Sequence, residues 1–166
     1  QQWETLMQVN LLSVMRLTGL LLPPMLERGS GHVVNISSIA GWVAAGGMSV
    51  YSASKFGVRG FGDSLARDLE DTGLRVTTVF PFFSRTPILD SIQFGEDPPR
   101  KVPDDIVTDP GDVVRAILRG IREERDYVFP DPTARRLHRL QRFFPRLVLW
   151  FGRRFEERAR AAGEPG

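Results

Sequence analysis

The chain has 166 residues, of which 42% are hydrophobic and 25% charged, an ordinary composition for a globular domain with a real core. It contains no cysteine, which excludes disulfides, thiolate catalysis and cysteine-based metal sites, and its two histidines predict no metal centre. The net charge is +2, but residues 133–166 carry nine Arg against three Glu, so the positive charge gathers in the C-terminal tail.

The first residues already lie inside a helical pattern, without an initiator methionine or a signal peptide. We therefore expect the chain to be a piece of a longer protein. No run of about 18 uncharged apolar residues occurs, so no membrane-spanning helix is expected. The absence of cysteine fits a cytoplasmic location.

Residues 1–28 are predicted to form one amphipathic helix, because leucines and valines recur at helical spacing. Pro23 and Pro24 should bend or end this helix, and Gly29 follows as a stop signal. Asn10 is the unusual polar residue of the segment. Taken alone, it is expected to face solvent.

A parallel strand–helix–strand unit is predicted next. Residues 32–37 are almost continuously apolar or β-branched, which is typical of a buried strand, and residues 38–41 form a loop at its carboxyl end. Open α/β sheets bind their ligands at that end. A helix over about 48–71 follows, and residues 74–80 give a second buried strand that Pro81 ends.

The remaining elements are shorter. Residues 82–109 form a long segment with several prolines, and a loop of that length is usually functional or mobile. Asp109 and Pro110 then begin a helix as its cap and first residue. Residues 127–129 are predicted to form a third short strand.

Tyr51 and Lys55 lie four residues apart at the start of the helix predicted over 48–71, which places them on one helical face. A nearby cation favours the phenolate, so Lys55 is expected to lower the pKa of Tyr51. A tyrosine tuned in this way can give and take a proton near neutral pH. The alternative for the pair taken alone is a surface tyrosine beside a surface lysine.

Residues 1–131 resemble the short-chain dehydrogenase/reductase family. The resemblance rests on five features in order: Asn10 within VNLLS, VNISSIAG at 34–41, Tyr51 and Lys55 thirteen and seventeen residues after Ser38, the strand LRVTTVF ending in Pro81, and Thr86 five residues beyond. It implies an α/β fold, the C-terminal half of a Rossmann-type doubly wound parallel sheet. It also implies an oxidoreductase that interconverts an alcohol and a carbonyl with NAD or NADP.

The resemblance assigns a role to each catalytic residue. Tyr51 is implied to be the general acid for a carbonyl oxygen, or the base in the oxidative direction. Lys55 would lower the Tyr51 pKa and hold the nicotinamide ribose, and Ser38 would hydrogen-bond the substrate oxygen. Ser37 is the alternative serine, less favoured by its distance from Tyr51. Asn10 would bind a water that links Lys55 to solvent.

Pro81 and Thr86 are implied to line the nicotinamide side of the cofactor site, with Thr86 near the carboxamide. Ordinary loop and cap roles remain the alternative for both residues. The chain departs from the family at Phe82, where a glycine is usual, and Phe83 adds further bulk. This departure puts the fine geometry of the site in doubt.

A second departure is the absence of a glycine-rich phosphate loop after a strand. The residue that selects NAD or NADP is absent with it. The strand at 32–37 should therefore pair on one side with a strand from outside the chain and otherwise expose an apolar edge. We expect residues 1–166 alone to bind dinucleotide poorly.

Apolar residues around the expected pocket predict a hydrophobic substrate, with segment 84–108 as a lid. They are Trp42, Val43, Phe82, Phe83, Ile88, Leu89, Ile92 and Phe94.

Residues 132–166 are expected to form a basic, amphipathic helical tail beyond the oxidoreductase domain of 1–131, split into two helices by Pro145. Its aromatic and arginine residues fit packing on the domain or on a partner subunit. They also fit a peripheral membrane contact by 133–160. Nucleic-acid binding is not expected, since no recognition motif is present.

The sequence thus predicts an enzyme that lies in the cytoplasm or peripherally at a membrane and pairs with its own copies through helices 1–28 and 48–72. The alternative is a truncated, non-catalytic fragment that acts through association or membrane-surface binding.

Overall fold

The computed structural model describes residues 1–44, 46–87, 102, 104–148 and 150. Its main sheet has the strand order β1–β2–β5, and both pairings are parallel. The strands are β1 (Gly31–Ile36), β2 (Leu74–Val79) and β5 (Tyr127–Val128). β1 and β2 pair in register from Gly31 opposite Leu74 to Ile36 opposite Val79. The predicted parallel strand–helix–strand unit is confirmed.

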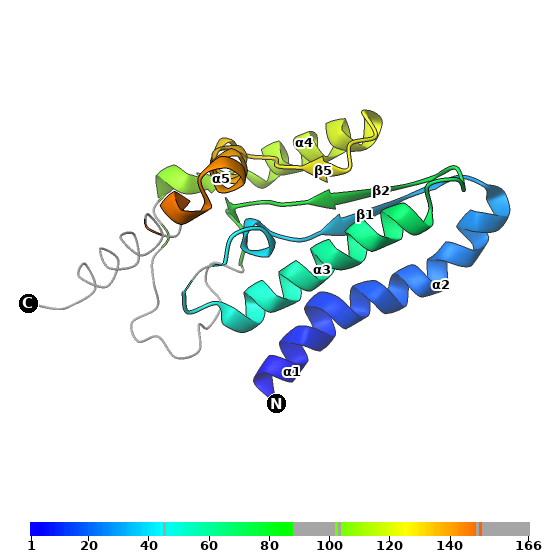
Figure 1. The fold of residues 1–166 in the computed structure, drawn as a ribbon, viewed down its shortest axis with the longest axis horizontal. Coiled ribbons are helices and arrows are strands. Elements are labelled where there is room, and N and C mark those ends of the chain that lie inside the picture. Colours follow the sequence, from blue (N-terminus) through cyan, green and yellow to red (C-terminus); the bar gives the residue numbers. More distant parts are fainter. Residues whose placement is uncertain (45, 88–101, 103, 149, 151–166) are drawn as a thin grey trace, which may run out of the picture.

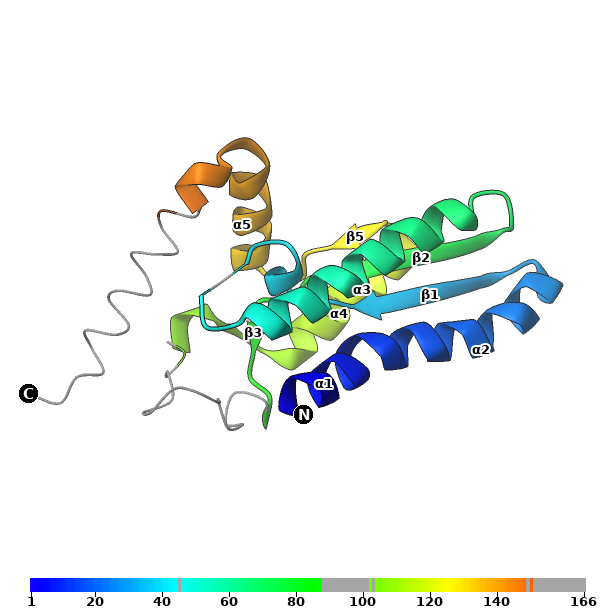
Figure 2. The ribbon, with the colours of Figure 1, turned by 60° about the horizontal axis from the view of Figure 1, so that its bottom comes forward.

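Helices cover both faces of this sheet, as Figures 1 and 2 show. α3 (Ser49–Asp68) lies on one face with α1 (Gln2–Met7) and α2 (Ser13–Arg28) beside it, and α4 (Pro110–Arg122) lies on the other. This is the doubly wound arrangement expected from the sequence. β1 ends one side of the sheet among the described residues, with Ile36 47% exposed, so an edge is available there for another strand.

The chain also forms a second, two-stranded sheet and one more helix. β3 (Phe83–Ser84) pairs in parallel with β4 (Val107–Thr108), after a short 3₁₀ turn at Asp104–Ile106. α5 (Pro132–Phe143) then packs near the carboxyl ends of the strands. Residues 88–101 and 103 lie outside the described residues, and so does most of the predicted lid, including Ile88, Leu89, Ile92 and Phe94.

The N-terminal helix does not end at its prolines. α2 continues through Pro23 and Pro24 to Arg28, and Figure 1 shows its last turns bending toward β1. Gly29 then takes the left-handed conformation, with φ of 66°, and its N–H donates to Leu26. A proline removes one intrahelical hydrogen bond but leaves the rest of the ladder, so the helix bends and goes on.

The helix from Gln2 to Arg28 is long and apolar enough to cross a membrane by length and composition, since an 18-residue stretch within it has a mean hydropathy of 1.4. The expectation of no such helix is wrong by these criteria, because Arg16 is the only charged residue between Glu4 and Glu27, where leucines are frequent. One such helix is weak support for a membrane span. The helix packs along α3, where Leu11 lies over Gly57. The pairing of copies through 1–28 and 48–72 stays a prediction.

A cluster of buried apolar residues lies between α3 and the sheet. Leu65 and Leu69 from the end of α3 pack on Leu74 and Val76 from β2, and all four are buried. The apolar stripe of the predicted helix therefore faces the sheet as its spacing requires. α3 ends at Asp68, three residues before the predicted end.

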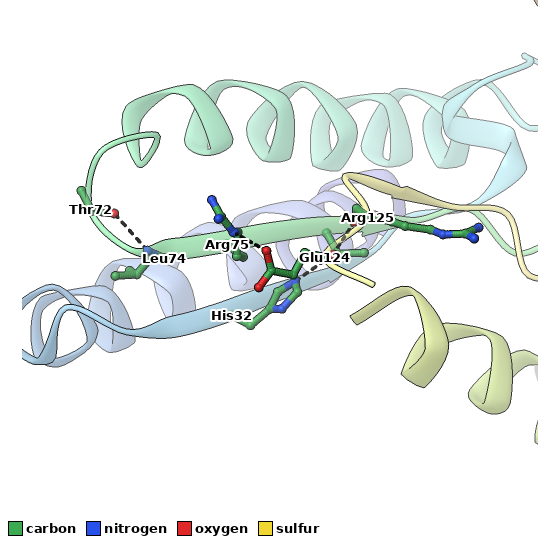
Figure 3. A network of polar contacts seen from close by, with 7 residues as sticks. His32, Thr72, Leu74, Arg75, Glu124 and Arg125 are labelled. Atoms are coloured by element: carbon green, nitrogen blue, oxygen red, sulfur yellow. Dashed lines mark hydrogen bonds and ion pairs between the residues drawn. The ribbon is translucent and has the colours of Figure 1, made fainter. Parts of the chain in front are cut away.

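A polar network fixes the position of the third strand. The Thr77 hydroxyl donates to the Arg125 carbonyl at 2.7 Å and lies 2.7 Å from His32 Nε2. Since that hydroxyl has one proton, which is already donated, the Nε2 atom of His32 carries the proton of the second bond. Arg75 and Glu124 form an ion pair at 3.1 Å beside it, and Figure 3 shows the two contacts side by side. The turn before β5 is thus tied to β2, and His32 of β1 joins the same network through Thr77.

Candidate active site

Two consecutive serines leave the carboxyl end of β1 in different directions. The Ser37 hydroxyl donates to the Lys55 carbonyl of α3 at 2.8 Å and is buried. Ser38 is extended, and its hydroxyl accepts the Ala40 N–H at 3.2 Å. The Ser38 hydroxyl also hydrogen-bonds the phenol of Tyr51. Of the two serines that are candidates for bonding a substrate oxygen, Ser38 is the one beside Tyr51.

The loop after Ser38 lies close against α3, which explains why residue 41 is a glycine. A Cβ atom on Gly41 would come within 2.5 Å of Ser37 Oγ and 2.6 Å of the Lys55 carbonyl oxygen. No side chain fits in that space without moving the helix or the loop. The absence of a side chain at Gly41 therefore helps to hold Ser38 against the first turns of α3.

Tyr51 and Lys55 occupy the first two turns of α3. The Lys55 ammonium lies 5.8 Å from the centre of the Tyr51 ring, and it donates to the Ile36 carbonyl at 3.1 Å. An ammonium has three N–H donors, so this bond leaves others for a ligand. Ser38, Tyr51 and Lys55 thus meet at the carboxyl end of β1, the edge at which α/β sheets bind ligands.

The electrostatics of the pair differ from the sequence expectation. Burial raises the pKa of the Tyr51 phenol above its ordinary value, and the hydrogen bond from Ser38 opposes that rise. Burial lowers the pKa of Lys55. The expected lowering of the Tyr51 pKa by Lys55 is therefore wrong for the structure as it stands. Both observed shifts are caused by desolvation, which disfavours the charged form of each group.

Replacing Ser38 with alanine should raise the pKa of Tyr51 further. The serine favours the phenolate by donating a hydrogen bond, and alanine cannot donate one. Tyrosinate absorbance during an alkaline titration would measure this in a Tyr127→Phe background, where Tyr51 is the remaining tyrosine. An unchanged or lowered pKa in the Ser38→Ala variant would contradict the contact.

Asn10 is held by α3 and does not face solvent as its isolated position suggested. It lies in a π-helical turn, Gln8–Leu12, between α1 and α2, a local geometry that is frequent at functional sites. Its amide donates to the Ser54 hydroxyl at 3.2 Å, and Ser54 donates to the Tyr51 carbonyl at 2.7 Å. Asn10 therefore supports the backbone of the Tyr51 turn. Its link to Lys55 through a water stays a prediction.

Pro81 lies beside the Ser38 loop, because the Ile39 N–H donates to the Pro81 carbonyl at 2.8 Å. Thr86 lies farther along the chain, after β3, and its hydroxyl donates to the Ser84 carbonyl at 3.4 Å. This is the local loop role that was the alternative for Thr86. The assignment of Pro81 and Thr86 to a cofactor stays a prediction.

Asp131 has a structural role that its sequence context does not indicate. This carboxylate is 1% exposed, and its two oxygens accept the Phe82 N–H at 2.9 Å and the Ala134 N–H at 2.7 Å. It therefore joins the start of α5 to the turn that follows Pro81. The Asp131-Pro132 pair is a recognisable helix-start signal, but nothing in the sequence indicated the second bond to Phe82.

The expected apolar pocket is only partly described. Phe82 and Phe83 pack edge to face with ring centres 4.7 Å apart. Trp42 is engaged elsewhere: it packs edge to face on Phe80 at 5.2 Å and on His138 of α5 at 4.6 Å, and the Arg59 guanidinium lies 3.7 Å from its ring centre. Trp42 also lines an open hollow together with Val43, and its place beside a substrate pocket stays a prediction.

Comparison with known proteins gives a consistent result. The family model for short chain dehydrogenases matches residues 1–97. An NADP-dependent 3-hydroxy acid dehydrogenase from Salmonella typhi is 40% identical over 98 residues, which cover 58% of this chain and 39% of the relative. The chain spans 42% or less of the length of the first three curated relatives that it matches.

Solved structures share the fold. A short-chain dehydrogenase from Streptomyces avermitilis is 27% identical with a TM-score of 0.71, over 93% of this chain and 61% of that one. A short chain dehydrogenase/reductase from Burkholderia phymatum, solved in complex with NAD, has a TM-score of 0.72 at 24% identity, over 87% of this chain and 59% of that one. The second likeness shows the fold alone.

Proposed function

This chain belongs to the short-chain dehydrogenase family, and we propose that it supplies the catalytic half of an oxidoreductase that interconverts an alcohol and a carbonyl with NAD or NADP. The observation that carries the proposal is the meeting of Ser38, Tyr51 and Lys55 at the carboxyl end of β1. A hydroxyl donor, a proton-bearing phenol and an ammonium are the groups that a carbonyl oxygen needs when it gains negative charge.

The nicotinamide dinucleotide would supply or accept the hydride at the carbonyl carbon. In the reductive direction, Ser38 donates a hydrogen bond to the carbonyl oxygen, and Tyr51 gives that oxygen its proton. A phenol whose pKa is raised by burial is fully protonated at neutral pH, so it is ready to act as an acid. In the oxidative direction, Tyr51 must first lose that proton.

Lys55 is the residue through which a bound dinucleotide would change the site. Its ammonium donates to the Ile36 carbonyl and has donors left for ribose hydroxyls. Together with Tyr51, Pro81 and Thr86 it would hold the nicotinamide end.

The substrate class is proposed to be hydrophobic. Phe82 and Phe83 add apolar bulk immediately after Pro81, where the family has a glycine. The relative from Salmonella typhi is named for 3-hydroxy acids, so acids of this class belong beside bulky apolar alcohols and ketones in a substrate panel. A screen of that panel with both dinucleotides, on the chain joined to its upstream coding sequence, tests the proposal. No turnover of any alcohol or carbonyl would overturn it.

Residues 1–166 alone should bind NADH and NADPH more weakly than micromolar. The chain has no glycine-rich turn to hold the pyrophosphate, and β1 offers an open edge where a further strand would pair. Fluorescence titration of the isolated chain with each dinucleotide measures this. Micromolar binding would contradict the expectation, whereas weak binding with full activity in the extended protein would support it.

A further inference from the structure

The basic tail divides into a packed part and an exposed part. Within α5, Ala134 is fully buried, and the ring of His138 stacks on Phe129 with ring centres 4.1 Å apart. The first helix of the tail therefore packs on the domain, which is one of the roles that the sequence left open for its apolar side. Val148 beyond the helix is buried as well, but three further apolar residues lie at the end of α5 and just beyond it.

Those residues face outward. Phe143 is 68% exposed, Phe144 is 60% exposed and Leu147 is 41% exposed. The helix breaks at Phe144 and resumes at 145–148, as the position of Pro145 predicted. The side chains around this break line an open hollow of about 480 Å³. Exposed phenylalanines gathered in this way mark an interaction surface more often than scattered ones do.

Positive charge surrounds these phenylalanines. Arg139, Arg142 and Arg146 are exposed in the same turns, and the Arg142 guanidinium lies 5.9 Å from the centre of the Phe143 ring. No acidic residue occurs between Asp131 and Glu156 to offset them. Aromatic rings flanked by arginines match the boundary of an anionic bilayer, where rings enter the headgroup region and guanidinium groups meet phosphate.

We propose that this aromatic–arginine patch binds the surface of an anionic membrane. It consists of Phe143, Phe144, Leu147, Arg139, Arg142 and Arg146. Charge complementarity selects the lipid surface over a second copy of the chain, because a symmetric contact would place the arginines of one copy against those of the other. The proposal does not depend on the hydride chemistry.

Flotation of the full chain with vesicles tests the patch. We expect binding to vesicles of equal parts phosphatidylcholine and phosphatidylserine, and little binding to phosphatidylcholine alone. A triple change of Phe143, Phe144 and Leu147 to serine removes the apolar part, and a triple change of Arg139, Arg142 and Arg146 to glutamine removes the charge. Each should weaken binding at least about tenfold, since each removes one of the two forces.

Matched controls come from the exposed side of α4. Val114→Ser with Leu118→Ser, and Arg119→Gln with Arg122→Gln, remove similar groups outside the patch and should leave flotation unchanged. Circular dichroism confirms that each variant is folded. Absence of binding to the anionic vesicles, or equal binding by the patch variants, would overturn the proposal. So would a concentration-dependent dimer that the patch variants lose without any vesicle binding.

Discussion

Replacing Tyr51 with phenylalanine should lower kcat/KM for carbonyl reduction by roughly 10²- to 10⁴-fold, which is the usual contribution of a positioned general acid. The change removes one hydroxyl and leaves the ring where it packs, so the fold should survive. Ser38 would remain to polarise the carbonyl oxygen, but nothing would deliver its proton. Steady-state kinetics on the chain joined to its upstream coding sequence measure the loss.

Tyr127→Phe is the matched control, because Tyr127 is the second of the two tyrosines in the chain. Its hydroxyl is exposed and donates to Asp63 at 2.9 Å. This variant should keep its activity within about twofold and lose less than about 1 kcal/mol of stability. If the two variants lost activity equally, Tyr51 would have no special role.

Replacing Asp131 with alanine should lower the free energy of unfolding by about 3 kcal/mol. About 1 kcal/mol comes from the lost helix cap, and the rest comes from leaving the Phe82 N–H without its charged acceptor in a buried site. Urea denaturation followed by circular dichroism measures the difference. The same variant should also loosen the turn after Pro81, which lies beside Ser38 through Ile39.

Asp109→Ala separates the two contributions. Asp109 also precedes a proline and caps α4 by accepting from Gly111 and Asp112, but it is exposed. The Asp109→Ala variant should therefore lose only the contribution of the cap, about 1 kcal/mol, from its free energy of unfolding. If Asp131→Ala were no more damaging than Asp109→Ala, the bond between Asp131 and Phe82 would contribute nothing.

The elements that could be predicted from the sequence are those with strong local signals. β1 and β2 are rich in β-branched residues, and α4 begins with an aspartate cap followed by proline, so their types and approximate ends follow from local chemistry. The distance along the chain to Tyr51 favours Ser38 over Ser37. The structure separates the two serines by what each hydroxyl contacts.

The features that the sequence did not predict share one physical cause, because each depends on the tertiary structure around the residue. The path from Asn10 through Ser54 to the Tyr51 backbone crosses from one helix to another, and no spacing in the sequence reveals it. The bond from Asp131 to Phe82 joins residues far apart in the chain. The direction of the Tyr51 pKa shift depends on burial, which the four-residue spacing to Lys55 does not report.

The most direct test of the central claim follows the hydride itself. The chain joined to its upstream coding sequence is incubated with a carbonyl substrate and a dinucleotide that carries deuterium at the transferable position of the nicotinamide. We predict that deuterium appears on the carbinol carbon of the product, and that the Tyr51→Phe variant forms this product at a small fraction of the rate. Product without deuterium, or equal rates in both proteins, would contradict the account.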